Sequence, residues 1–177
     1  MARYDGGMAE SLLGVELDNG GVLIKFVQTT VETNGALHRQ EARYPPRSPL
    51  PPYHRHPRQD ERFEIVEGEL LFRVDGVDRL VRAGEHLDVP RGALHQARNP
   101  GDHPTLAIWE TRPALRTADF FVAMNRAMRS RAKPGLLDAA AILNEYRDEF
   151  QLAKPPLLVQ RLVFGCLAPF GRRALRP

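Results

Sequence analysis

Turn signals recur at a near-constant interval through the middle of the chain, and this spacing restricts the fold more than any other feature. They stand at Glu67-Gly68, Asp75-Gly76, Gly84, Arg91-Gly92 and Pro100-Gly101. Short strands separated by a turn every eight or so residues are typical of an all-β sandwich or barrel. Apolar residues alternate with the others along residues 70–75, so one face of that strand is apolar. We therefore expect β-structure from about residue 21 to residue 112.

Beyond residue 112 the apolar residues follow a helical period. Phe120, Phe121, Met124 and Met128 fall on one face, which predicts a helix that ends before Pro134. A second helix is expected near residues 138–152, and an apolar stretch follows at 157–170. The sequence thus predicts an N-terminal arm (1–20), a β-barrel domain (21–112) and a C-terminal helical extension (113–177).

The composition is that of an ordinary globular protein, with 42% hydrophobic and 27% charged residues in 177. No apolar run approaches the roughly 20 residues of a membrane-spanning helix, and no secretory signal is visible. The single cysteine, Cys166, lacks an intrachain disulfide partner and lies in an apolar run, so we expect a buried, inert thiol. These features predict a cytoplasmic protein.

Charge is distributed unevenly along the chain. Residues 1–111 carry 13 Lys and Arg against 17 Asp and Glu, whereas residues 112–177 carry 12 against 5. The basic C-terminal end, with Arg172, Arg173 and Arg176, follows an apolar stretch. We favour the interpretation that this stretch packs on the barrel or on a second subunit. The alternative is that it lies on an anionic membrane surface. No groove-reading motif accompanies the charge, so no nucleic-acid partner is expected. Strand edges and apolar helix faces predict a homodimer.

Four residues form a candidate metal-binding set: His54, His56, Glu61 and His95. Side chains at i and i+2 of a strand point to the same face, so the first two histidines project together. Three imidazoles and one carboxylate suit Fe(II), Mn(II), Ni(II), Zn(II) or Cu(II) without selecting one of them. Four ligands of an octahedron leave two positions open for water, substrate or dioxygen.

These residues lie in two stretches that resemble the paired motifs of the cupin superfamily, G-x5-H-x-H-x3/4-E-x6-G and G-x5-P-x-G-x2-H-x3-N. Nine of the ten prescribed positions match, and only the first glycine is replaced, by Ser48. The matching residues are His54, His56, Glu61 and Gly68 in the first motif, and Gly84, Pro90, Gly92, His95 and Asn99 in the second. The resemblance covers about residues 20–112 and implies a double-stranded β-helix, or jelly-roll barrel, with one divalent metal ion inside.

The same resemblance implies several functions. Oxygen-dependent oxidation of a small organic substrate by a dioxygenase-type oxidoreductase comes first, with Glu61 as a metal ligand or, when detached, a general base. A metal-dependent isomerase or lyase comes second, and a non-catalytic small-molecule-binding protein third. A barrel that kept the motif and lost the metal is the alternative to all metal-dependent readings, because fold alone does not fix function.

The remaining candidates are interpreted as structural. His86 and His103 are expected to be solvated, and His38 is expected on a surface-facing side of its strand. Either Trp109 or Glu110 should face inward, because the two are neighbours on one strand.

Overall fold

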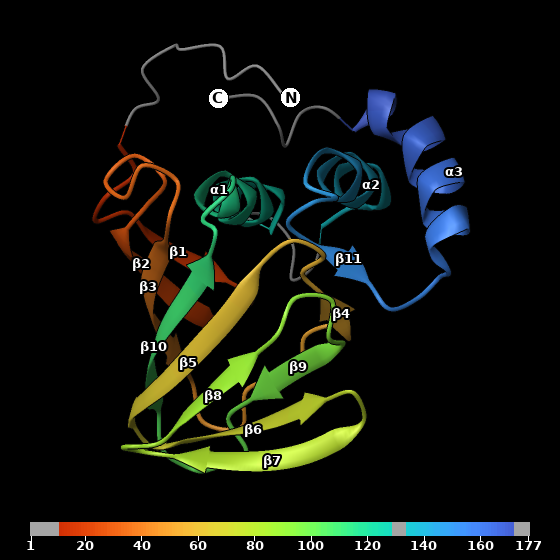
Figure 1. The fold of residues 1–177 in the computed structure, drawn as a ribbon. Coiled ribbons are helices and arrows are strands. Elements are labelled where there is room, and N and C mark those ends of the chain that lie inside the picture. The colour runs from red at the N-terminus through yellow and green to blue at the C-terminus, as the bar shows by residue number, and fades with distance from the viewer. Residues whose placement is uncertain (1–10, 129–133, 172–177) are drawn as a thin grey trace.

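A computed structural model describes residues 11–128 and 134–171 of the chain. Two antiparallel sheets face each other and form a barrel, with helices gathered at one end (Figure 1). The larger sheet contains, in spatial order, β1 (Glu16–Asn19), β2 (Val22–Gln28), β3 (His38–Tyr44), β10 (Thr105–Arg112), β5 (Asp60–Glu67) and β8 (His86–Val89). The smaller sheet contains β11 (Gln151–Leu152), β4 (His54–Arg55), β9 (His95–Arg98), β6 (Glu69–Val74) and β7 (Val77–Arg82).

The predicted all-β jelly-roll architecture is confirmed. Alternation along β6 buries Leu70 and Phe72 completely, and both pack in the core between the two sheets. Gly68 forms the turn between β5 and β6 with a φ of +78°, and a Cβ there would lie 2.5 Å from the Thr105 hydroxyl oxygen. Only glycine meets both conditions without strain, so this turn depends on it.

Three helices follow the barrel: α1 (Thr117–Met128), α2 (Leu136–Glu145) and α3 (Leu157–Leu167), the last continued by a 3₁₀ turn at Ala168–Phe170. Phe120 and Phe121 of α1 are buried against Ile24 and Phe26 of β2, which makes a second apolar core between the larger sheet and the helices. The helices α1 and α2 therefore cover one end of the barrel (Figure 1).

The prediction of a second helix as far as residue 152 is wrong at its C-terminal end. Helix α2 ends at Glu145, and the chain then returns to the barrel as β11, which lies beside β4 (Figure 1). In this pairing Gln151 opposes Arg55 and Leu152 opposes His54. Backbone pairing with a distant strand has overridden the local helical pattern. At the other terminus, β1 pairs with β2, so part of the expected arm belongs to the larger sheet.

The outer face of α3 departs from a second expectation. Cys166 is exposed, not buried, because α3 turns much of its apolar surface outward, including Leu158 and Leu162. The three terminal arginines, Arg172, Arg173 and Arg176, lie outside the described residues. Within residues 11–128 and 134–171, no helix combines the length and the apolar character needed to cross a membrane.

Candidate metal centre

Three histidines meet inside the barrel where β4 and β9 run side by side. His54 and His95 are direct cross-strand partners, and His56 follows two residues after His54. The Gly92 amide donates to the His56 carbonyl at 2.9 Å, which joins the loops that carry the two motifs. All three side chains are buried, and one ring nitrogen from each lies within 4.8 Å of the others. The structure therefore brings the predicted histidines together.

Each of these imidazoles is oriented through its Nδ1 atom. His54 donates to the Pro52 carbonyl at 2.8 Å, His56 to the Glu149 carbonyl at 2.5 Å, and His95 to the Ala93 carbonyl at 3.1 Å. A carbonyl oxygen only accepts, so Nδ1 carries the hydrogen in all three rings. In the neutral form of each ring the lone pair then stands on Nε2, which is the arrangement that second-sphere bonds give to metal-binding histidines.

Glu61 completes the cluster from the neighbouring strand β5. Its Oε1 lies 3.2 Å from Nε2 of His56, and its Oε2 lies 2.9 Å from Nε2 of His95. Nevertheless, His56 Nε2 and Glu61 Oε2 are buried without a well-aligned hydrogen-bond partner. Buried polar atoms without partners are costly, and a cation among them would satisfy both. The donor set thus fits a divalent metal ion.

Burial and charge act in opposite directions on this cluster. Burial lowers the pKa of His54 and of His56, so both rings stay neutral and keep a free lone pair. Burial also acts to lower the pKa of His95, but the nearby Glu61 carboxylate outweighs it and raises that pKa. Burial alone would raise the pKa of Glu61, yet the adjacent His56 and His95 hold it at about 2. The carboxyl group is therefore ionised at neutral pH.

Trp109 faces the same interior, which answers the choice between Trp109 and Glu110. Its indole Nε1 donates to Glu61 Oε1 at 2.9 Å, and its ring stacks on Phe63 with centroids 4.9 Å apart. This contact fixes the orientation of the carboxylate toward the histidines. The sequence narrowed the position to two residues, and the register of β10 against β5 decides between them.

The C-terminal extension supplies two contacts that sequence reasoning missed. The backbone carbonyl of Glu149 orients His56, and the ring of Phe150 stacks on His54 at a centroid distance of 4.6 Å. Phe120 of α1 stacks in turn on Phe150, at 5.2 Å. These aromatic rings close the barrel directly above the histidines. No local signal marks a two-residue strand such as β11, so the sequence pattern could not have found them.

The chain resembles known proteins over its barrel. A model of the cupin domain family matches residues 40–109, which include all four candidate ligands and the whole of both motifs. The barrel has the cupin fold. The chain is 33% identical over 60 residues to the tetracenomycin polyketide synthase protein TcmJ of Streptomyces glaucescens, a match that covers 34% of this chain and 40% of the length of TcmJ.

Solved structures share the same fold. An RmlC-like cupin from Shewanella frigidimarina superposes with a TM-score of 0.51 and 22% identity, over 62% of this chain and 93% of that chain. At this level of identity the likeness concerns the fold. KdgF from a Halomonas species gives a TM-score of 0.49 and 21% identity, over 56% of this chain and 86% of that chain.

The one departure from the cupin motif has a structural role of its own. Ser48 is buried, and its hydroxyl accepts a hydrogen bond from the Asn99 amide at 2.8 Å. The Asn99 side chain donates to the carbonyls of Pro45 and His103 and accepts from the Gly101 amide. Serine in place of the motif glycine therefore links the loops that carry the two motifs.

Outside the centre, the predictions for the other histidines divide. His103 and His86 are exposed, as expected, whereas His38 is fully buried on the inner face of β3. The surface prediction for His38 is wrong because the register of β3 turns its even-numbered residues inward.

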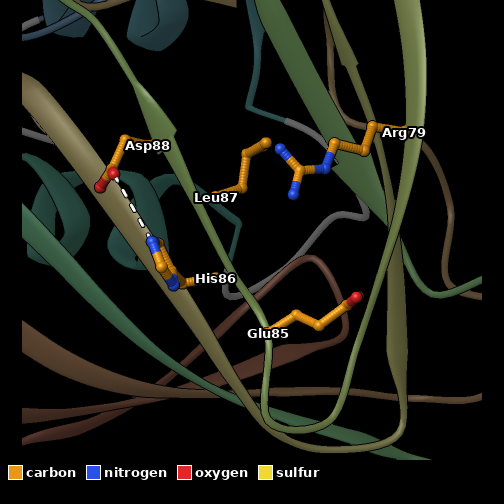
Figure 2. A pocket seen from close by; sticks show the side chains of 5 residues that line it. All are labelled: Arg79, Glu85, His86, Leu87 and Asp88. Atoms are coloured by element: carbon orange, nitrogen blue, oxygen red, sulfur yellow. Dashed lines mark ion pairs between the residues drawn. The ribbon is translucent and has the colours of Figure 1, made fainter.

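A surface hollow of about 440 Å³ lies between β7 and β8, where the edges of the two sheets face each other (Figure 2). It is lined by Arg79, Glu85, His86, Leu87 and Asp88, apart from the metal centre.

Proposed function

We propose that this cupin binds one divalent transition metal ion through Nε2 of His54, His56 and His95, and acts as a metal-dependent enzyme on a small organic substrate. The observation that carries the proposal is the locking of all three Nδ1 atoms on backbone carbonyls, which leaves three Nε2 lone pairs converging in a buried space. Such preorganisation has no other evident use in a core that could have been apolar.

Glu61 has two roles open to it. Ionised and beside two Nε2 atoms, it can serve as a fourth ligand, in agreement with the mixed nitrogen and oxygen set expected from the sequence. Detached from the ion, the same carboxylate can accept a proton from a bound substrate. The Trp109 indole holds one of its oxygens in either case, which fixes the direction in which the other oxygen points.

The first chemistry we propose is oxygen-dependent oxidation of the dioxygenase type. A divalent metal ion held by three or four protein ligands would supply open positions for substrate and dioxygen. The residues of this chain would orient the ligand and exclude water: Phe150 and Phe120 cover the histidines, and Trp109 and Phe63 form an aromatic wall. A closed aromatic surrounding of this kind favours a small, largely apolar organic substrate. The name of TcmJ, a polyketide synthase protein, agrees with an organic substrate.

Metal-dependent isomerase or lyase chemistry is the second candidate. It is favoured by one observation, the buried and ionised carboxylate of Glu61 beside Nε2 of His56 and His95, which can accept a proton from a bound substrate without dioxygen.

Two measurements test the proposal. Elemental analysis of the purified protein should give close to one transition metal ion per chain, and oxygen uptake should appear with at least one member of a panel of small phenols and diketones. Glu61→Gln should abolish turnover while most of the metal remains bound. Protein that takes up no metal in this site would overturn the metal-centre proposal; stoichiometric metal without oxygen uptake would overturn the dioxygenase assignment and favour the second candidate.

A further inference from the structure

Three polar side chains on the inner face of the larger sheet carry buried atoms without partners. They are His38 Nδ1, Gln40 Nε2 and Thr111 Oγ1. The exposed fractions of these residues are 0%, 0% and 1%, so bulk water does not satisfy them. An unpaired buried polar atom destabilises the folded state, and three together are costly unless a polar partner enters.

The strand register places these groups next to the metal centre. Thr111 on β10 is the direct partner of His38 on one side and of Glu61 on the other. Directly opposite side chains on one sheet face have Cβ atoms about 4.5–5.5 Å apart. Gln40 lies opposite Trp109, whose indole holds Glu61. The three unpaired groups thus continue the polar row that begins at the proposed metal ligands.

The hydrogen-bonding pattern defines what this row can take. His38 Nε2 shares a hydrogen bond with Gln40 Oε1 at 2.9 Å, so the ring donates there and its Nδ1 is an acceptor. The Gln40 amide nitrogen is a donor, and the Thr111 hydroxyl is either. If the Gln40 side-chain amide is turned by 180°, its nitrogen donates to His38 Nε2. The unpaired atoms are then Gln40 Oε1, an acceptor, and His38 Nδ1, a donor, so one unpaired donor and one unpaired acceptor remain. No permanent charge stands among the three, because burial lowers the pKa of His38 and keeps the ring neutral.

The walls around the row are aromatic. The edge of the Phe26 ring meets His38 with centroids 5.0 Å apart, and Phe121 of α1 stacks on the same imidazole at 6.3 Å. A neutral donor-and-acceptor group enclosed by aromatic rings matches a hydroxyl on a planar organic molecule better than it matches a carboxylate or phosphate, for which no cation is provided.

We propose that His38, Gln40 and Thr111 form a hydroxyl-binding subsite beside the metal centre, which takes the neutral hydroxyl group of a planar organic ligand whose other end reaches the metal. The proposal rests on the metal-dependent function inferred above and adds the substrate class. His38, predicted from sequence to be a surface residue, becomes a specificity-determining residue of this subsite.

A matched pair of probes tests the subsite. 3-Methylpyridine and 3-pyridylmethanol both offer a ring nitrogen to a metal and differ by one hydroxyl group. Titrated into the Co(II)-loaded protein, each would change the visible spectrum on coordination. We expect 3-pyridylmethanol to bind about tenfold more tightly, in line with one or two additional buried hydrogen bonds.

The variants Thr111→Val and Gln40→Met preserve shape and remove the polar atoms. Both should bring the affinity ratio close to one while the affinity for 3-methylpyridine, the cobalt content and the far-UV circular dichroism stay unchanged. His86→Ala, in the surface hollow of Figure 2, is the control and should keep the wild-type ratio.

Three results would overturn the subsite: equal affinities for the two probes in the wild type, an unchanged ratio in both variants, or no binding of either probe to protein that does hold cobalt. If the variants keep the wild-type affinity ratio but melt at a lower temperature, the three polar groups bind an ordered water only and not the ligand. Failure to load cobalt at all would instead refute the metal centre, so the two proposals fail separately.

Discussion

The imidazole of His56 donates a hydrogen bond to the backbone carbonyl of Glu149, 93 residues further along the chain. The contact joins the barrel to the segment after α2, and Phe150 reinforces it by stacking on His54. The C-terminal extension is therefore part of the candidate metal centre and not an appendage beside it.

Replacing a proposed ligand should remove the metal and leave the barrel folded. His56→Ala and His95→Ala are expected to lower metal content at least tenfold, because each removes one of three converging nitrogens. The apolar core between the sheets supplies the stability of the fold, so the far-UV circular dichroism should stay that of a β-protein. Metal content by mass spectrometry and circular dichroism measure both. His86→Ala is the control; an unfolded His95→Ala protein would contradict the second half of the prediction.

Opening the aromatic cover should speed the exchange of metal. Phe150→Ala removes the ring that lies on His54, so we expect a chelator to extract metal at least tenfold faster from the variant. Loss of this partly buried phenylalanine should also reduce the free energy of unfolding by about 2 kcal/mol, less than the roughly 3–5 kcal/mol of a Phe→Ala change in a fully buried core. Phe170→Ala is the matched control, because that ring is 75% exposed. Equal extraction rates for the two variants would show that Phe150 does not restrict access.

Restoring the motif glycine should destabilise the protein. Ser48→Gly removes the hydroxyl that accepts from the Asn99 amide and leaves that buried amide unpaired. The expected loss is about 1–2 kcal/mol in urea denaturation, seen as a lower midpoint with an unchanged slope. Ser48→Thr keeps the oxygen and is the comparison. A midpoint at or above that of the wild type would mean that the serine hydroxyl contributes nothing to the link between the loops.

Acid should destabilise the protein in part through His38. Burial lowers the pKa of this histidine in the folded state below its usual 6.5, so the unfolded chain binds a proton that the folded chain does not. The neutral His38 therefore leaves the free energy of unfolding undiminished above pH 6.5, and that free energy falls as the pH decreases below this value. His38→Gln should lose less stability than the wild type between pH 8 and pH 5, as measured by urea midpoints at both values. The same loss of stability in both proteins would show that groups other than His38 cause the destabilisation in acid.

The outward face of α3 should hold two copies together. Leu158 and Leu162 are 70% and 62% exposed, and such apolar stripes mark contact surfaces. We expect a homodimer by light scattering and a monomer for Leu162→Glu. Arg161→Glu changes the charge of the same helix without removing apolar surface, so it is the control. A monomeric wild type that sediments with anionic vesicles and not with neutral ones would favour the membrane alternative.

The sequence was most informative where chemistry depends on local spacing. Regular turns predicted the barrel, and the i, i+2 spacing predicted that His54 and His56 project together, because both relations follow from strand geometry. That Glu61 and His95 join them was implied by the resemblance to the cupin motifs. His38, Cys166 and the end of α2 were misjudged for the opposite reason. Which face of β3 is buried, where α3 turns its apolar side and whether residues 151–152 pair with β4 all depend on partners far away in the chain.

The pairing of β11 with β4 also bears on how the protein comes into existence on the ribosome. His54, His56 and His95 are made early, while Glu149 and Leu152 emerge only after both helices that precede them. Chains fold largely from the N-terminus during synthesis. In a nascent barrel His56 will thus lack its orienting carbonyl, and His54 will lack the ring of Phe150, until translation has passed residue 152. The candidate metal centre consequently reaches its final geometry only after the segment that follows α2 has been made.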